Sequence, residues 1–202
     1  MANLPTTHAS LLVRIRDAQD REAWGEFVRL YAPVVYHYAR KRGLQDADAA
    51  DLSQDVLRAV AASAKHFDYD PSRGSFCGWL FTLAHHRLRD FLARQQRQQQ
   101  GSGDSAVQAI LEAQISPADE RLLWDQEYEQ GLFTWAAERV RGQVQESTWQ
   151  AFWQTAVEGK SGQEVAGRLG LSVAAVYLAK SRVMARLRDE IRQIEERKGD
   201  PS

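Results

Sequence analysis

Apolar residues recur at intervals of three and four along most of this chain, and that spacing follows one face of an α-helix. The segment that begins at Phe76 is the clearest case, because its apolar residues form one stripe: Phe76, Trp79, Leu80, Leu83, Ala84, Leu88, Phe91 and Leu92. We find no stretch in which apolar and polar residues alternate as they do in a half-buried strand. The pattern therefore predicts an all-α protein.

The periodicity breaks once, in a stretch rich in Gln, Gly and Ser that is typical of a linker. We expect one helical domain over residues 8–95, a flexible acidic linker over 96–116 and a second helical domain over 117–195. A chain of 202 residues suits two such small domains. Within the first domain, Pro33 is expected to kink or restart a helix. The spacings Ser147–Gln150 and Ser161–Glu164 predict two capping boxes.

The formal net charge of −1 hides a strong segregation of charge. Residues 80–100 carry four arginines and one aspartate, and residues 160–202 carry nine cations and six acids. Between them, residues 101–138 carry eight acids and one arginine. Two separate basic segments favour a polyanion that is bound at two places, with nucleic acid as the first candidate. Exposed, solvated helix faces are the alternative interpretation.

Several function classes find no support in the sequence. Cys77 is the only cysteine, no apolar run approaches the ~20 residues of a membrane span, and the N-terminus does not resemble a signal peptide. A P-loop, a Gly-rich fingerprint and a Ser elbow are all missing, and the adjacent His85 and His86 point about 100° apart on a helix, so they cannot share a metal. We expect a cytosolic protein without enzymatic activity, cofactor, metal, small-molecule substrate or membrane association.

The run from Lys160 to Leu187 predicts a helix-turn-helix. Ser161 caps a short first helix, Gly170 permits the positive φ of a tight turn, and Ser172 caps the second helix. The small Ala166 lets the two helices cross closely. The second helix would enter the major groove of DNA, with its first turns toward the bases and its later cations toward phosphates. An ordinary helical hairpin with a solvated basic face is the alternative.

The helix that begins at Phe76 carries a second candidate surface. His85, His86, Arg87, Arg89 and Asp90 occupy the face away from the apolar stripe. Arginine and rings on an exposed helix suit single-stranded DNA, because rings stack on splayed bases while arginine holds phosphate. A core stripe with a solvated opposite face explains the same pattern without DNA.

Taken together, these segments resemble the extracytoplasmic-function (ECF) sigma factors of the sigma-70 class, which are bacterial transcription initiation factors. The similarity rests on four segments in the order of that family and covers about residues 10–95 and 118–192. These segments are Phe27-Val-Arg-Leu-Tyr31-Ala-Pro33-Val-Val-Tyr36, Asp51-Leu-Ser-Gln-Asp-Val56, Phe76 with Trp79-Leu80 and Ala84, and the helix-turn-helix at 160–187.

The resemblance implies that the first domain corresponds to sigma region 2. Such a domain binds the β′ clamp of core RNA polymerase, and it melts and reads the −10 promoter element. The positions that match the clamp-binding residues are Asp51, Gln54 and Asp55. Those that match the −10 pocket are Asp70, Arg73, Ser75, His86, Arg87, Arg89 and Asp90; many relatives have Asn where His86 stands, which makes the base preference of this chain its own.

The second domain resembles region 4, which reads the −35 element and contacts the β flap. The matching positions are Ala174, Ala175, Tyr177, Lys180, Ser181, Arg182 and Arg186. The family pattern has arginine where this chain has Tyr177 and Ala179, so we expect an unusual −35 sequence or a weaker dependence on it. The resemblance further implies an acidic linker that runs through the RNA-exit region, and an anti-sigma factor as a partner.

One alternative function remains open from the sequence. A transcription regulator could bind duplex DNA through the helix-turn-helix, dimerise through its N-terminal helices and act without core polymerase. The segment Asp51–Val56 and the basic helix after Phe76 argue against this alternative, since a dimerisation domain has no use for them.

Overall fold

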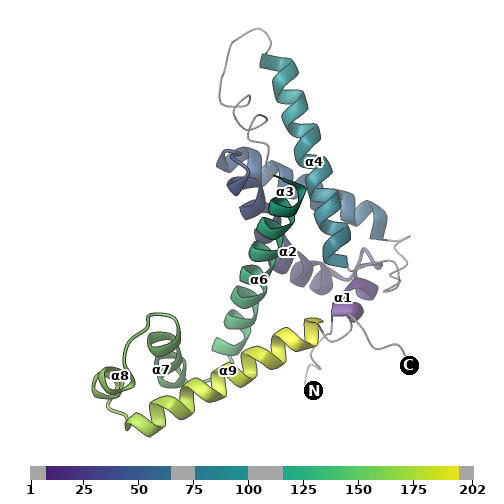
Figure 1. Cartoon of the computed structure of the whole chain (residues 1–202). Coiled ribbons are helices and arrows are strands. Elements are labelled where there is room, and N and C mark those ends of the chain that lie inside the picture. The colour runs from purple at the N-terminus through teal and green to yellow at the C-terminus, as the bar shows by residue number, and fades with distance from the viewer. Residues whose placement is uncertain (1–7, 65–75, 100–115, 196–202) are drawn as a thin grey trace. The chain divides into compact units, whose positions relative to one another are not determined.

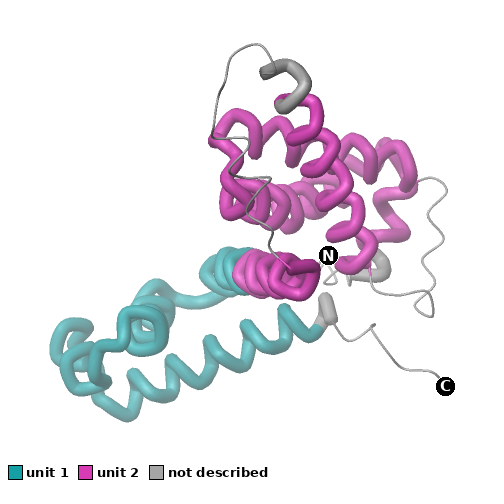
Figure 2. Tube along the Cα trace, turned by 45° about the horizontal axis from the view of Figure 1, so that its top comes forward, with its two compact units in different colours: residues 1–5, 132–197 teal, residues 6–131, 198–202 magenta. Residues whose placement is uncertain are grey.

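The computed structural model describes residues 8–64, 76–99 and 116–195. Every element of regular secondary structure in these residues is a helix, which confirms the predicted all-α class. The chain divides into two compact units, one built mainly from residues 6–131 and the other from residues 132–197 (Figure 2). None of the described helices is long and apolar enough to cross a membrane.

The unit of residues 6–131 consists of α1 (His8–Arg14), α2 (Arg21–Lys41), α3 (Asp46–Ala64), α4 (Phe76–Gln99) and the first half of α6 (Pro117–Arg141) (Figure 1). α3 packs against both α2 and α4. Three aromatic rings from the segments that resemble sigma factors pack together. They belong to Phe27, Tyr31 and Phe76, and their centroids lie 4.7–5.9 Å apart. The side chains that fill this core are Phe27, Leu30, Tyr31, Val34, Tyr38, Leu52, Val56, Phe76, Leu80 and Leu88.

α2 begins at a charged cap and continues past Pro33. The Ala23 amide donates to Asp20 Oδ1 (2.9 Å), and Arg14 donates to both oxygens of the same carboxylate (2.6 and 2.8 Å). The Arg14 hydrogen bond, followed by that of the Ala23 amide, lowers the pKa of Asp20. The expected restart at Pro33 is wrong. Burial of apolar side chains on both sides of Pro33 offsets the ~3 kcal/mol that an internal proline costs.

The first half of α6 is part of the core of this unit. Trp124 has no exposed surface, and its indole lies edge-on to the ring of Tyr38 and tilted against that of Phe81, with centroids 5.4 and 5.6 Å away. Trp124 Nε1 donates to Cys77 Sγ at 3.2 Å. About two turns further along, a Cβ added at Gly131 would lie 2.7 Å from Val34 Cγ2, so glycine allows α6 to approach α2 closely here.

Glu120 is the buried charge that fixes this part of α6. Its carboxylate accepts the Tyr38 hydroxyl at 2.7 Å. Arg42 Nε and His85 Nδ1 lie 3.0 and 3.1 Å away, at ion-pair distance but without the angle of a hydrogen bond. Burial, followed by the bond to Glu120, raises the pKa of Tyr38, so the phenol remains a donor. A buried carboxylate is stable only with such partners.

α4 continues to Gln99, into the segment that was expected to be a linker, so the prediction of linker structure is wrong for residues 96–99. The helix continues because residues 95–100 are only Gln and Arg, which favour a helix. The Gly and Ser residues that disfavour one begin at position 101. The apolar positions Val107, Ile110 and Leu111 lie outside the described residues. The compact units divide within α6, and the domain boundaries at 95 and 117 stay a prediction.

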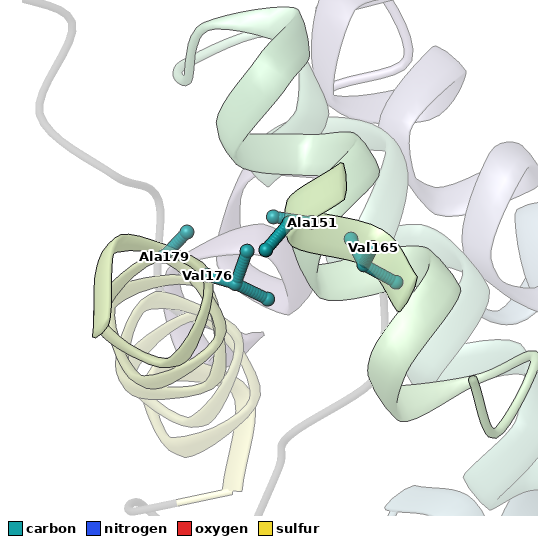
Figure 3. Packing of buried hydrophobic residues seen from close by; sticks show 5 residues of the cluster. Ala151, Val165, Val176 and Ala179 are labelled. Carbon is teal, nitrogen blue, oxygen red and sulfur yellow. The ribbon is translucent and has the colours of Figure 1, made fainter. Parts of the chain in front are cut away.

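The unit of residues 132–197 contains the second half of α6, with α7 (Glu146–Ala156), α8 (Gly162–Leu169) and α9 (Val173–Glu195). α9 packs against α7 and α8. Figure 3 shows the small side chains where these helices meet: Ala151, Val165, Val176 and Ala179. Near the far end of α9, the carboxylate of Glu190 accepts hydrogen bonds from Arg139 Nε and Gln143 Nε2, both at 3.1 Å.

The caps of the helix-turn-helix are those predicted, and the cap of α7 is not. The Glu164 amide donates to Ser161 Oγ (3.2 Å), and the Ala175 amide donates to Ser172 Oγ (3.1 Å). Gly170 has φ +66°, the left-handed conformation that the turn needs. The capping box at Ser147 is wrong, because α7 already begins at Glu146 and has no side-chain cap.

Trp124→Ala tests whether the first half of α6 belongs to the unit of residues 6–131. Removal of a fully buried indole that contacts Tyr38 and Phe81 should lower the free energy of unfolding by about 3–5 kcal/mol. Urea unfolding of the full chain, followed by circular dichroism, measures the loss. Leu122→Ala is the matched control, since Leu122 lies on the same helix with 57% of its surface exposed and should change little. Equal stabilities of the two variants would contradict the packing described here.

Gly170→Ala and Gly167→Ala form a second matched pair. Alanine at position 170 must adopt a positive φ, so this variant should lose about 1 kcal/mol of stability. Gly167 lies inside α8 with no atom within 4 Å of an added Cβ, so alanine there should stabilise by about 0.5–1 kcal/mol. Thermal unfolding of the two variants should shift in opposite directions. A shift of the same sign would refute the assigned turn.

Candidate nucleic-acid interface

α9 presents one buried and one exposed face. Val176, Ala179, Val183 and Leu187 are buried, and they pack toward α7 and α8. Five of the seven positions predicted for DNA contact are exposed: Ala174, Tyr177, Ser181, Arg182 and Arg186. Ala175 and Lys180 are half-buried. The expectation that Lys180 lies on the outward face is therefore wrong, because its position is about 40° from that of Val176 around the helix, beside the buried face.

Tyr177 is fixed against the first helix of the helix-turn-helix. A Cβ added at Gly162 would lie 2.8–2.9 Å from two ring carbons and the hydroxyl oxygen of Tyr177, so the phenol rests directly on the backbone at that position. More than half of the side chain, 55%, nevertheless stays exposed. The ring is thus held in place by α8 and also available to a ligand.

The cations of α9 differ in how they are held. Arg186 Nη1 donates to the Gln143 carbonyl at 3.2 Å, which ties this arginine to the end of α6. Arg182 is exposed, and within the described residues it has no ion-pair partner. Arg188 is exposed one turn further on. Arg182 is the cation best placed to reach a phosphate from the middle of the exposed face.

α4 carries the second candidate surface. His86, Arg89 and Asp90 are exposed, whereas Arg87 is half-buried. His85 is also half-buried, because it lies against Glu120 and against the ring of Phe81, 5.8 Å from its own ring centroid. The two adjacent histidines thus lie in different environments: His85 packs against Glu120 and Phe81, and His86 is exposed. Three other positions predicted for the −10 pocket, Asp70, Arg73 and Ser75, lie outside the described residues.

The third surface lies on α3. Asp51, Gln54 and Asp55 are exposed together, as their spacing of three and four residues requires. Ser53 on the opposite face is buried, and its Oγ donates to the Ala32 carbonyl of α2 at 3.1 Å. Arg58 forms an ion pair with Asp55 at 2.9 Å across one turn. The arrangement offers a rigid acidic edge to a cationic partner.

Sequence reasoning missed two features that bear on these surfaces. Leu178 is 57% exposed beside Tyr177 on α9, and a projection at 100° per residue from Val176 would have placed it outward. The predicted second domain, residues 117–195, includes three residues that are buried in the unit of residues 6–131: Glu120, Trp124 and Glu127. Within the described ranges, no group of three His, Cys, Asp or Glu side chains could hold a metal ion.

Comparison with known proteins finds a family match over part of the chain. Residues 27–98 match the family Sigma-70 region 2, a range that contains both the α3 and the α4 surfaces. The ECF RNA polymerase sigma factor RpoE of Cereibacter sphaeroides is 36% identical over 89 residues, which is 44% of this chain and 48% of that protein. The chain therefore spans about half the length of this relative.

A second relative matches over more of its length. The RNA polymerase sigma factor CnrH of Cupriavidus metallidurans is 29% identical over 168 residues, 83% of this chain and 86% of that protein. A solved structure of CnrH in complex with the cytosolic domain of CnrY aligns with 90% of this chain and 95% of that chain, at 22% identity and a TM-score of 0.37.

The region 2 match covers the helices that carry the acidic and the basic surfaces, and both relatives are RNA polymerase sigma factors. Residues 27–98 therefore belong to the Sigma-70 region 2 family, and the chain is similar to RNA polymerase sigma factors over the aligned residues.

Proposed function

We propose that this chain binds core RNA polymerase through α3, melts and reads a −10 element through α4, and reads a −35 element through α9. The observation that carries the proposal is the match to Sigma-70 region 2 at residues 27–98, within which an exposed acidic edge and an exposed basic helix lie on the same unit. The helix-turn-helix of the other unit adds a duplex-binding surface.

Contact with core is assigned to Asp51, Gln54 and Asp55, which would face cations of the β′ clamp. Carboxylates at the rim of an interface steer association, and those that become desolvated cost several kcal/mol when only one partner is removed. The intramolecular pair of Asp55 with Arg58 is exposed, so exchange for a clamp arginine costs little. On this basis the proposal assigns the electrostatic part of the clamp contact to Asp51 and Asp55.

The −10 element is assigned to the exposed side of α4 with the segment that precedes it. His86 and Arg89 project from this side, and a ring next to a cation suits a base flipped out of the stack. Arg87 and Asp90 complete the helical part, and Asp70, Arg73 and Ser75 the preceding segment. His86 stands where many relatives have Asn, so it is the position that would set a base preference particular to this chain.

The −35 element is assigned to the exposed face of α9, where the chain lacks the two family arginines at Tyr177 and Ala179. Ala174, Tyr177 and Ser181 would face bases, and Arg182 and Arg186 phosphates. Half-buried Ala175 and Lys180 then support the face from its edge. The proposal also includes the β flap as a contact of this unit, an anti-sigma factor as regulator, and the cytoplasm as the site of action, where polymerase works.

The proposal is tested by transcription with purified components. Core polymerase, this chain and fragmented genomic DNA of the host should yield transcripts whose mapped 5′ ends share two upstream elements. Arg182→Ala should then reduce transcription from these promoters by roughly tenfold, in line with the ~1–3 kcal/mol of one good contact. If starts are confined to sites that core already uses and the chain does not bind core, it is instead a duplex-binding regulator with paired half-sites.

Asp51→Asn combined with Asp55→Asn tests the acidic edge. Loss of two charges that face clamp cations should weaken binding to core by roughly tenfold or more and leave the fold unchanged, because both side chains are exposed. Competition against a labelled sigma factor for core measures the affinity. Glu129→Gln, on an exposed position of α6, is the control. Core affinity equal to that of the control would rule out this edge as the clamp contact.

A further inference from the structure

The exposed face of α9 carries large apolar side chains in its first two turns, where a DNA-reading helix is usually polar or charged. Three large apolar side chains of its first turns are exposed: Val173 by 41%, Tyr177 by 55% and Leu178 by 57%. The buried residues of α9 follow the helical period, so the helix already has a face that packs on the core. The three exposed side chains lie on its other faces. Their place at the start of the second helix is the place from which such a helix reaches base edges.

The residues around Leu178 leave it as the one large side chain at the centre of this face. At 100° per residue, Leu178 lies about 200° from the buried Val176. Ala174, Ser181 and Ala185 share its side of the helix, and all three are exposed. Small neighbours let the helix backbone come close to the floor of a groove, while Leu178 projects furthest toward it.

Charge beside this face indicates a nucleic-acid occupant. Arg182 follows Leu178 by one turn and has no ion-pair partner in the described part of the chain, and Arg186 and Arg188 continue the cationic edge. An apolar patch built for a protein partner is instead typically depleted of charge at its centre and large in area. Here a single leucine and one tyrosine ring stand within reach of three arginines.

We propose that this chain reads its −35 element by apolar contact of Leu178 and Tyr177 with the methyl groups of thymines in the major groove. Thymine is the one base with an apolar group at the major-groove edge, its C5 methyl. Tyr177 is fixed by its packing on Gly162, so its ring meets the groove without a loss of side-chain entropy. This inference rests on the proposed function and names the chemistry of its −35 contact.

The test removes one methyl group at a time. Holoenzyme formed from the full chain and core is bound to a promoter mapped as above, with each thymine of its −35 element replaced in turn by deoxyuridine. Uracil keeps every hydrogen-bonding group of thymine and lacks only the methyl. Loss of one buried methyl should weaken promoter binding by about fourfold at one or more positions.

Leu178→Ala identifies the protein side of the contact. This variant should bind the thymine promoter several-fold more weakly, and it should no longer distinguish thymine from uracil at the position that Leu178 contacts. Arg182→Ala should weaken binding to both templates equally, since a phosphate contact does not sense the methyl. Val157→Ala, with an exposed valine outside the helix-turn-helix, is the control for loss of exposed apolar surface.

Three results would overturn the inference while the proposed function stands. These are promoter binding that is insensitive to uracil at every −35 position, a −35 element of G·C pairs only, and a Leu178→Ala variant that keeps the full discrimination. A Leu178→Ala variant that loses affinity for core itself would assign the leucine to a protein contact. A chain that directs no promoter-specific transcription overturns both the proposed function and the inference.

Discussion

The unit of residues 6–131 depends on the interactions of one buried carboxylate, that of Glu120. This carboxylate gathers a tyrosine from α2, an arginine from the end of α2 and a histidine from α4 around one point of α6. Trp124, one turn along, fills the apolar space that remains between Tyr38 and Phe81. Burial of a charge is costly unless every partner is present, so this cluster selects one arrangement of three helices rather than merely adding stability. α4, which carries the proposed −10 surface, is one of the helices held in that arrangement.

Much of this could be predicted from local patterns, because helix faces and caps are decided within a few residues. The apolar stripe of α4, the Ser161 and Ser172 caps and the left-handed Gly170 all follow from spacing and residue type. The capping box predicted at Ser147 is wrong because Ser147 has the right spacing to Gln150 but Glu146, which precedes it, already lies in the helix. The restart expected at Pro33 is wrong for a different reason: burial on both sides of the proline outweighs its local cost, while the kink given as the other expectation stays a prediction.

The contacts of Glu120 and Trp124 could not be predicted in the same way. Glu120 lies 82 positions from Tyr38, and Trp124 lies 47 from Cys77, so no periodic pattern links either pair. Residues 101–138 are strongly acidic, yet two glutamates of this segment are buried, and they pair with Lys41 of α2 and with Arg42 at its end. The net charge of a segment therefore predicts its surface charge only where the charged side chains are exposed, and Glu120 and Glu127 are not. On α9, by contrast, the helical period alone places Lys180 about 40° from the buried Val176, so the half-burial of Lys180 could have been predicted.

The packing of α6 on α4 has a consequence for the proposed −10 surface. His85 is held by Glu120, whereas its neighbour His86 is exposed on the same turn. Withdrawal of α6 from this unit would leave Glu120 and His85 without their partners and would expose the indole of Trp124. Each of these changes costs on the order of 1–3 kcal/mol. α4 therefore presents His86 and Arg89 from a braced helix. A base-flipping surface needs this rigidity, because the unstacking of DNA costs a few kcal/mol that the pocket can return only if its groups are already in position.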